Sequence, residues 1–159
     1  MVRVLGIDPG LQHTGWAILE GHQGKISHID SGTIHTNAKD LLDQRLVLIG
    51  REIRAIIINH TPIYAAIEET YVNKNYGSSL KLAHARGVGI FAIAEHNISV
   101  AEYSAKTVKK TVCGSGAADK TQIEKMLRLF LPNVVIKSPD QSDAISIAYC
   151  HLLHLNLRT

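Results

Sequence analysis

The sequence has few of the features that mark exported, membrane-bound or disulfide-rich proteins. It contains two cysteines, Cys113 and Cys150, which do not form a CxxC pair. This excludes both a disulfide framework and a cysteine zinc site. No apolar run reaches the roughly 18 residues of a membrane span, and no signal-peptide or lipidation motif is present. These absences predict a soluble protein of the cytoplasm.

The chain also lacks repeats, linkers and low-complexity segments that would divide it. Its 159 residues, of which 45% are hydrophobic, are enough to bury a core and few enough for one domain. We therefore expect a single domain over residues 1–159.

Positive charge is concentrated in the second half of the chain. Residues 1–70 carry six Lys and Arg against eight Asp and Glu, whereas residues 71–159 carry eleven against six. The densest stretch, residues 106–128, has six basic residues against two acidic ones. This asymmetry favours a polyanionic partner, although a solvated face with scattered charge would give the same pattern.

The hydrophobic pattern predicts an α/β protein. Strands are expected at residues 2–8, 14–19, 25–36, 63–68 and 98–102. Helices are expected at residues 40–60, 78–97, 104–112, 119–131 and 140–155. Short turns join the first three strands, which indicates an antiparallel meander. The simplest packing is a five-stranded mixed sheet, three antiparallel strands followed by two parallel ones, with helices on both faces.

Two carboxylates stand at the ends of predicted strands. Asp8 closes the first strand, directly before the turn Pro9-Gly10, and Glu68 closes the fourth strand. If these strands are neighbours, both carboxylates emerge at the same edge of the sheet. Asp before Pro-Gly is also an ordinary turn residue, whereas Glu68-Glu69 places two like charges after a buried run without an obvious structural purpose.

Two further carboxylates begin the last helix. In "SPDQSD", Ser138 is expected to be the N-cap, with Pro139 at the first helical position and Gln141 completing a capping box. This frame puts Asp140 and Asp143 three residues apart on one face of the helix. The helix dipole alone also favours acidic residues at this end.

The four acids together suggest a metal site. Unpaired carboxylates at close range repel each other and take up protons, so four of them from three elements would need a cation between them. Ligands that are all oxygen select a hard ion such as Mg²⁺ or Mn²⁺. A pair of such ions commonly serves to split a phosphodiester by in-line attack of water.

Four stretches resemble one known family. They are "LGIDPGLQHTGWAI", "YAAIEETYVNKNYGSSLKLAHARGVGI", "VKKTVCGSGAADKTQI" and "PDQSDAISIAYCH". In this order they are similar to the RuvC family of Holliday-junction resolvases, of the ribonuclease H-like superfamily, from about residue 3 to residue 152. The resemblance implies a homodimeric, Mg²⁺- or Mn²⁺-dependent endonuclease that nicks two opposed strands of a four-way DNA junction and works with a branch-migration motor.

The resemblance also assigns residues. It implies that the metal-binding catalytic acids, with two ions between them, are Asp8, Glu68, Asp140 and Asp143. Tyr71 matches a position whose aromatic ring inserts at the junction centre, where stacking on a base is worth about 1–3 kcal/mol. Lys109 and Lys120 match lysines near the scissile phosphate, although they are also ordinary solvated helix residues. On charge alone, Lys74, Lys81 and Arg86 extend the DNA-facing surface.

Three other functions are weaker interpretations. "GSGAADKT" nearly spells a phosphate-binding P-loop, but Asp119 replaces its second glycine and the preceding segment is predicted to be helical. "GIDPG" also resembles the phosphate motif of actin-like and sugar-kinase ATPases, which need two such domains. A third alternative is a protein of nuclease fold that binds branched nucleic acid without cutting it, and four intact acids argue against this.

Overall fold

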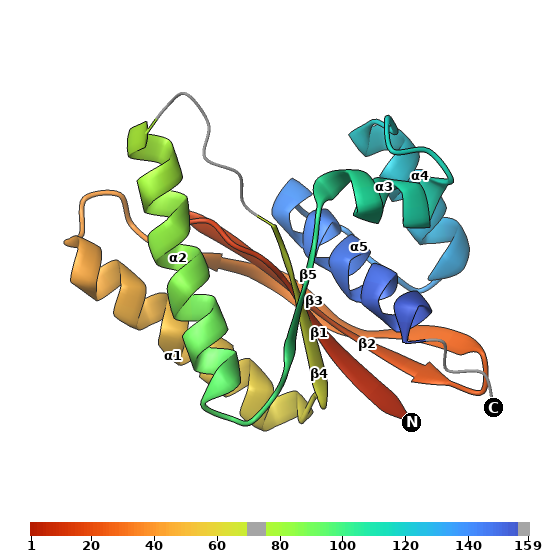
Figure 1. The fold of residues 1–159 in the computed structure, drawn as a ribbon, viewed down its shortest axis with the longest axis horizontal. Coiled ribbons are helices and arrows are strands. Elements are labelled where there is room, and N and C mark those ends of the chain that lie inside the picture. Colours follow the sequence, from red (N-terminus) through yellow and green to blue (C-terminus); the bar gives the residue numbers. More distant parts are fainter. Residues whose placement is uncertain (70–75, 156–159) are drawn as a thin grey trace.

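The molecule is built on one five-stranded sheet, seen nearly edge-on in Figure 1. The computed structural model describes residues 1–69 and 76–155. The strands are β1 (Val2–Asp8), β2 (His13–His22), β3 (Lys25–His35), β4 (Tyr64–Glu68) and β5 (Val100–Tyr103). Their spatial order is β3-β2-β1-β4-β5. β1, β2 and β3 pair antiparallel, and β4 is parallel to both β1 and β5. The predicted mixed sheet is confirmed.

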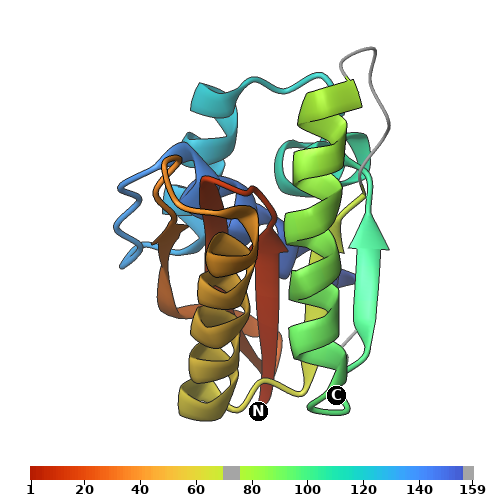
Figure 2. The same ribbon diagram turned by 90° about the vertical axis from the view of Figure 1, so that its left-hand side faces the viewer.

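Helices cover both faces of the sheet, as predicted. They are α1 (Leu42–His60), α2 (Tyr76–Ala94), α3 (Ala105–Cys113), α4 (Lys120–Phe130) and α5 (Pro139–His154). α1 and α2 lie side by side over one face (Figure 2), and α5 with α3 and α4 covers the other (Figure 1). Among the described residues, no helix is long and apolar enough to cross a membrane.

Strand β1 is buried on both sides, which explains its continuous apolar run. Leu5 and Ile7 belong to the core cluster beneath α1 and α2, whereas Val4 belongs to the cluster beneath α5. Successive side chains of a strand point to opposite faces, so a strand between two helical layers is apolar at nearly every position.

The element boundaries differ most from prediction in the hairpin of β2 and β3. β2 was expected over residues 14–19 but runs from His13 to His22, because His22 still pairs with Lys25. Gln23 and Gly24 make the turn with φ values of 48° and 75°, which suits a two-residue hairpin loop. α2 also ends earlier than expected, at Ala94.

Helix α5 packs unusually close to the sheet. A Cβ added at Gly6 would lie 2.3 Å from the carbonyl oxygen of Ala144, and one at Gly15 would lie 2.0 Å from that of Asp140. The absence of a side chain therefore lets helix and strand backbones approach directly. This contact sets the first turn of α5 over the ends of β1 and β2.

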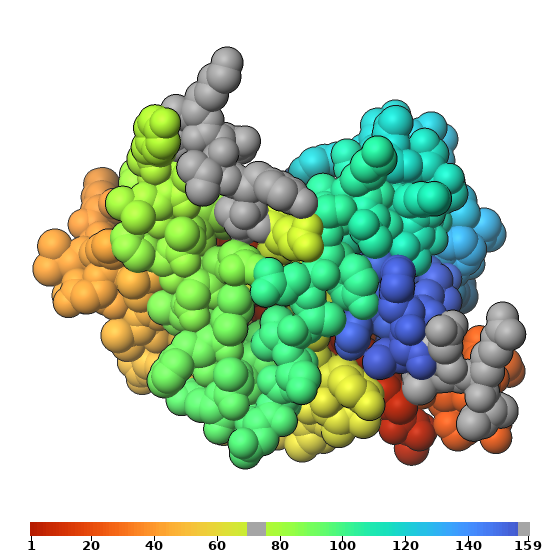
Figure 3. Space-filling view, in the orientation of Figure 1, coloured from red at the N-terminus to blue at the C-terminus, as the bar shows by residue number. Residues whose placement is uncertain are grey.

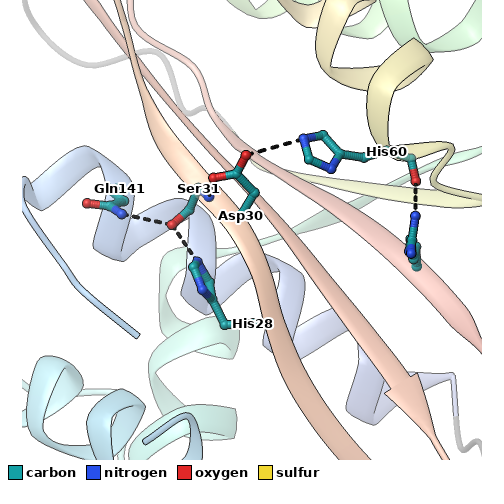
Figure 4. A network of polar contacts seen from close by, with 6 residues as sticks. His28, Asp30, Ser31, His60 and Gln141 are labelled. Carbon is teal, nitrogen blue, oxygen red and sulfur yellow. Dashed lines mark hydrogen bonds and ion pairs between the residues drawn. The ribbon is translucent and has the colours of Figure 1, made fainter. Parts of the chain in front are cut away.

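The N-terminus of α5 is capped, but not by the predicted capping box. Ser138 Oγ accepts a hydrogen bond from the Gln141 amide at 3.1 Å, as expected for an N-cap. Gln141 Oε1, however, accepts from the amide of Lys137 at 2.7 Å. Its Nε2 donates to Ser31 Oγ at 2.8 Å (Figure 4). The capping-box prediction was therefore wrong, because Gln141 Oε1 accepts from the Lys137 amide and not from the Ser138 amide, while Nε2 ties the helix to β3.

Candidate active site

The four predicted acids converge at one edge of the sheet. Asp8 is the last residue of β1 and Glu68 the last of β4. Ile7 and Ile67 are register partners in this parallel pair, so the two strand ends are adjacent. The first turns of α5, which carry Asp140 and Asp143, begin beside this edge (Figure 1). In the space-filling view the yellow end of β4 reaches the surface between α2 and α3 (Figure 3).

The acids lie close enough to perturb each other. Burial, followed by the charges of Asp143, Glu68 and Asp140, raises the pKa of Asp8 to about 8. The pKa values of Glu68 and Asp143 are also raised, chiefly by burial. A cluster of this kind cannot hold all its negative charges at neutral pH unless positive charge is supplied from outside it.

Two lysines supply part of that positive charge. Lys120, the first residue of α4, places Nζ 3.4 Å from Asp143 Oδ2. Lys120 and Lys109 of α3 both lower the pKa values of Glu68 and Asp143. The two lysines that the family resemblance singled out therefore lie beside the acids, while their contact with DNA stays a prediction.

The P-loop-like stretch has a structural explanation. Helix α3 precedes it, and Asp119 is the N-cap of α4, accepting a hydrogen bond from the Gln122 amide at 2.9 Å. Gln122 Oε1 in turn accepts a hydrogen bond from the Asp119 amide at 2.9 Å, which completes a capping box. The segment thus starts a helix and directs Lys120 toward the acids.

Arg86 is engaged within the protein. Its Nη2 donates to Glu102 Oε2 on β5, and its Nε donates to the backbone carbonyl of Glu68 at 3.3 Å. The side chain is only 20% exposed. The guanidinium therefore supports the end of β4, and its contact with DNA stays a prediction.

The remaining predicted DNA contacts are less constrained. Lys81 is exposed on α2, and its contact with DNA stays a prediction. Tyr71 and Lys74 lie outside the described residues.

Sequence reasoning missed two residues that position the site. Gly15 is the register partner of Asp8 in the β1–β2 pair. Because it has no side chain, it also leaves room for the carbonyl of Asp140. Glu102 holds Arg86 beneath Glu68. The glycine lies inside a motif quoted above, and the acid ends a predicted strand, but neither pattern reveals the partner without the strand register.

The acids fit a hard divalent cation by donor type and by charge. Four carboxylates offer only oxygen ligands, and their mutual repulsion would be relieved by a cation. Within the described part of the chain, no three His, Cys, Asp or Glu side chains form a group that could hold a metal as they stand. The backbone therefore brings the four acids close together, while their side chains are not arranged as a preformed metal site.

Comparison with known proteins identifies the family to which this chain is similar. The model of the family Crossover junction endodeoxyribonuclease RuvC matches residues 4–151. The protein of that name from Acidiphilium cryptum (strain JF-5) is 43% identical over 153 residues, 96% of this chain and 92% of the relative. Its counterpart from Paracoccus denitrificans (strain Pd 1222) is 41% identical over 157 residues, 99% of this chain and 95% of the relative.

Solved structures share the fold. T. thermophilus RuvC in complex with Holliday junction substrate superposes with a TM-score of 0.92 at 23% identity, covering 99% of this chain and 96% of that chain. The yeast mitochondrial Holliday junction resolvase Ydc2 gives a TM-score of 0.66 at 14% identity, covering 94% and 78%. These superpositions confirm the ribonuclease H-like fold. With the family match over most of its length, the chain belongs to the RuvC family of crossover junction endodeoxyribonucleases.

Proposed function

We propose that this protein is a structure-specific endodeoxyribonuclease that resolves four-way (Holliday) junctions by paired, metal-dependent hydrolysis, in homologous recombination and DNA repair. The observation that carries the proposal is the convergence of four acids from three elements in a chain of the RuvC family. Relatives carry the name crossover junction endodeoxyribonuclease, and the T. thermophilus structure is a complex with Holliday junction substrate. Residues 1–159 would act as a single nuclease domain in the cytoplasm, where DNA is repaired.

The residues that would hold the metal are Asp8, Glu68, Asp140 and Asp143. Their oxygen donors suit Mg²⁺, with Mn²⁺ as a substitute, and a cluster of this charge suits two ions. When bound, such ions lower the pKa of a water molecule and stabilise the negative charge of the departing 3′ oxygen. Hydrolysis by water leaves 5′-phosphate and 3′-hydroxyl ends.

The chain's own cations would complete the chemistry. Lys120 is held at the site by its bond to Asp143, and Lys109 approaches from α3. A fixed positive charge beside the scissile phosphate stabilises the extra negative charge of the transition state. Arg86 holds the backbone of Glu68 through the carbonyl at 3.3 Å, so we assign it the positioning of one carboxylate.

We also propose a homodimer formed through α2. Leu80 and Phe91 are 59% and 62% exposed and, eleven positions apart, lie on one stripe of the helix. His84 lies between them, and its Nδ1 is buried without a hydrogen-bond partner among the described residues. A second copy on this stripe would cover the apolar side chains, and a two-fold dimer places one site on each of two equivalent strands. Phe91→Glu should give monomers in sedimentation equilibrium.

The deciding experiment uses a four-way junction labelled on each strand in turn. We expect paired nicks of opposed strands with Mg²⁺ and none with EDTA. Asp8→Asn should still bind the junction but should no longer nick it, whereas Asp43→Asn, an exposed acid of α1, should behave like the wild type. Cleavage that survives in Asp8→Asn would overturn the assignment of the site.

The main alternative is a protein that binds junctions without cutting them. Tight junction binding by the wild type, with no nicks in either Mg²⁺ or Mn²⁺, would favour it. A branch-migration motor remains a proposed partner, which co-sedimentation with the purified motor on junction DNA would test.

A further inference from the structure

Two histidines face each other at the edge of the sheet that carries the acids. His13 begins β2, His35 ends β3, and the two are register partners. Their Nδ1 atoms are 2.9 Å apart, the ring centroids are 5.0 Å apart and edge-to-face, and both side chains are exposed. Because water could satisfy each ring separately, this convergence is not required to bury polar groups.

The histidine pair lies on the face of the sheet that α5 covers. His13 is two residues before Gly15, so both point to the same face, and Gly15 packs against the carbonyl of Asp140. On β3, Thr33 pairs with Gly15, and its Oγ1 lies 2.7 Å from Ser138 Oγ. His35 is two residues further along this face. The pair therefore stands just beyond the N-terminus of α5.

The acids lie between this pair and the two lysines. Asp8 and Glu68 end the central strands β1 and β4. α3, which carries Lys109, packs on the β4 side, where Val108 contacts the cluster of Ala66. The histidines belong to β2 and β3 on the opposite side. Strands are about 4.8 Å apart, so a DNA strand that crosses the acids would reach the pair within one or two nucleotides.

The chemistry of the pair suits an anion. If the two Nδ1 atoms share one proton, the ring that accepts it must carry its own proton on Nε2. One further proton, on the Nε2 that is still bare, makes both Nε2 atoms donors and gives the pair one positive charge. Two outward N–H donors with one charge match the oxygens of a phosphodiester.

A groove continues from His35 along β3. Its volume is about 510 Å³, and its walls include the exposed Lys137. Other polar groups of the wall are bonded within the protein, such as Ser31 to Gln141 (Figure 4). Asp30 is the acidic residue of the lining, and its carboxylate lies 3.4 Å from His60 Nε2. Lys137 is the lysine of this lining, and His35 adds a ring nitrogen, whereas His28, which also lines the groove, bonds to Ser31 Oγ at 2.7 Å.

We infer that His13 and His35 form a phosphate subsite that holds the DNA backbone one or two nucleotides from the scissile phosphate, with the strand continuing toward Lys137. This inference rests on the proposed junction-cleaving function. With this subsite, the DNA backbone would contact the histidine pair on one side of the acids and the two lysines on the other side. The DNA strand would then be held on both sides of the scissile phosphate.

The test combines protein variants with chemically modified DNA. The double variant His13→Asn/His35→Asn should bind the four-way junction about 3–10-fold more weakly than the wild type in EDTA. The slope of log affinity against log salt should fall by about one, as expected for one lost phosphate contact. A neutral methylphosphonate at the contacted phosphate should weaken binding by the wild type but have no further effect on the double variant. The matched control is His22→Asn, an exposed histidine at the other end of β2.

The outcomes are distinguishable. If the wild type neither binds nor nicks the junction, the proposed function fails. If the wild type nicks but the double variant keeps the affinity and salt slope of His22→Asn, the subsite is overturned. It is also overturned if the variants differ only when Zn²⁺ or Ni²⁺ is added, since the pair is then a metal site. Should the double variant melt early, the single variant His35→Gln carries the same test.

Discussion

Replacing Asp8 by Asn should stabilise the protein in EDTA while it removes the proposed nuclease activity. In the folded chain the pKa of Asp8 rises from 3.8 to about 8, because burial and three neighbouring carboxylates disfavour its charged form. In the unfolded chain the carboxyl titrates near its ordinary value. At neutral pH the folded protein therefore carries either an extra proton or a disfavoured charge, whereas asparagine has neither.

The sign and size of the effect follow from proton binding. Between about pH 4 and pH 8 the folded state holds more protons than the unfolded state, so the free energy of unfolding falls as pH rises. The shift from 3.8 to about 8 corresponds to roughly 6 kcal/mol as an upper limit. Asp8 is partly exposed, and solvent screening reduces this figure. We expect Asp8→Asn to gain about 1–3 kcal/mol at pH 8 and little at pH 4.

Urea denaturation in EDTA at pH 5 and pH 8 measures this difference directly. Asp43→Asn on α1 is the matched control and should show no comparable dependence on pH. Added Mg²⁺ should close most of the gap at pH 8, because a bound cation neutralises the wild-type carboxylates and stabilises the folded state. A difference between wild type and Asp8→Asn that is the same at both pH values would refute the reasoning.

Substitutions at three further positions test how the site is positioned and charged. Gly15→Ala should lower both the melting temperature and the cleavage rate, because its Cβ would lie 2.0 Å from the Asp140 carbonyl oxygen; a wild-type melting curve would contradict this. Arg86→Met should slow cleavage more than it weakens junction binding, and Arg86→Lys should restore part of the rate, because the bond to the Glu68 carbonyl is lost and then partly regained. Lys120→Met should move the pH profile of cleavage to higher pH, since Lys120 lowers the pKa values of the carboxylates beside it; an unmoved profile would refute that role.

Local patterns were sufficient to predict most elements. β1 has the boundaries expected from its apolar run before Pro9-Gly10, and Ser138 is the N-cap that its place before Pro139 indicated. Helical periodicity placed α1 and α4 within two residues of their observed bounds. Each of these features depends on neighbours a few positions away, so a single sequence contains the necessary information.

Contacts between residues far apart in the sequence could not be predicted, because they depend on the order and register of the strands. The bond from Gln141 Nε2 to Ser31, 110 residues away, has no signal in the local spacing around Gln141. The partners of Arg86, a residue of α2, likewise come from two strands, β4 and β5. Charge alone does not reveal these internal bonds of the guanidinium, which follow from the strand order.

The packing of helix α5 offsets the free-energy cost of bringing the acids together. Burial, together with repulsion from the neighbouring carboxylates, raises the pKa of Asp8, and the same repulsion opposes any arrangement that brings the acids together. Contacts that involve no carboxylate oppose that repulsion: the close approach at Gly6 and Gly15, and the bond from Gln141 to Ser31. Since these contacts place the backbone of α5, a cation is needed to order the carboxylate side chains but not to dock the helix. Far-UV circular dichroism should therefore be the same in EDTA and in Mg²⁺, even though the free energy of unfolding differs.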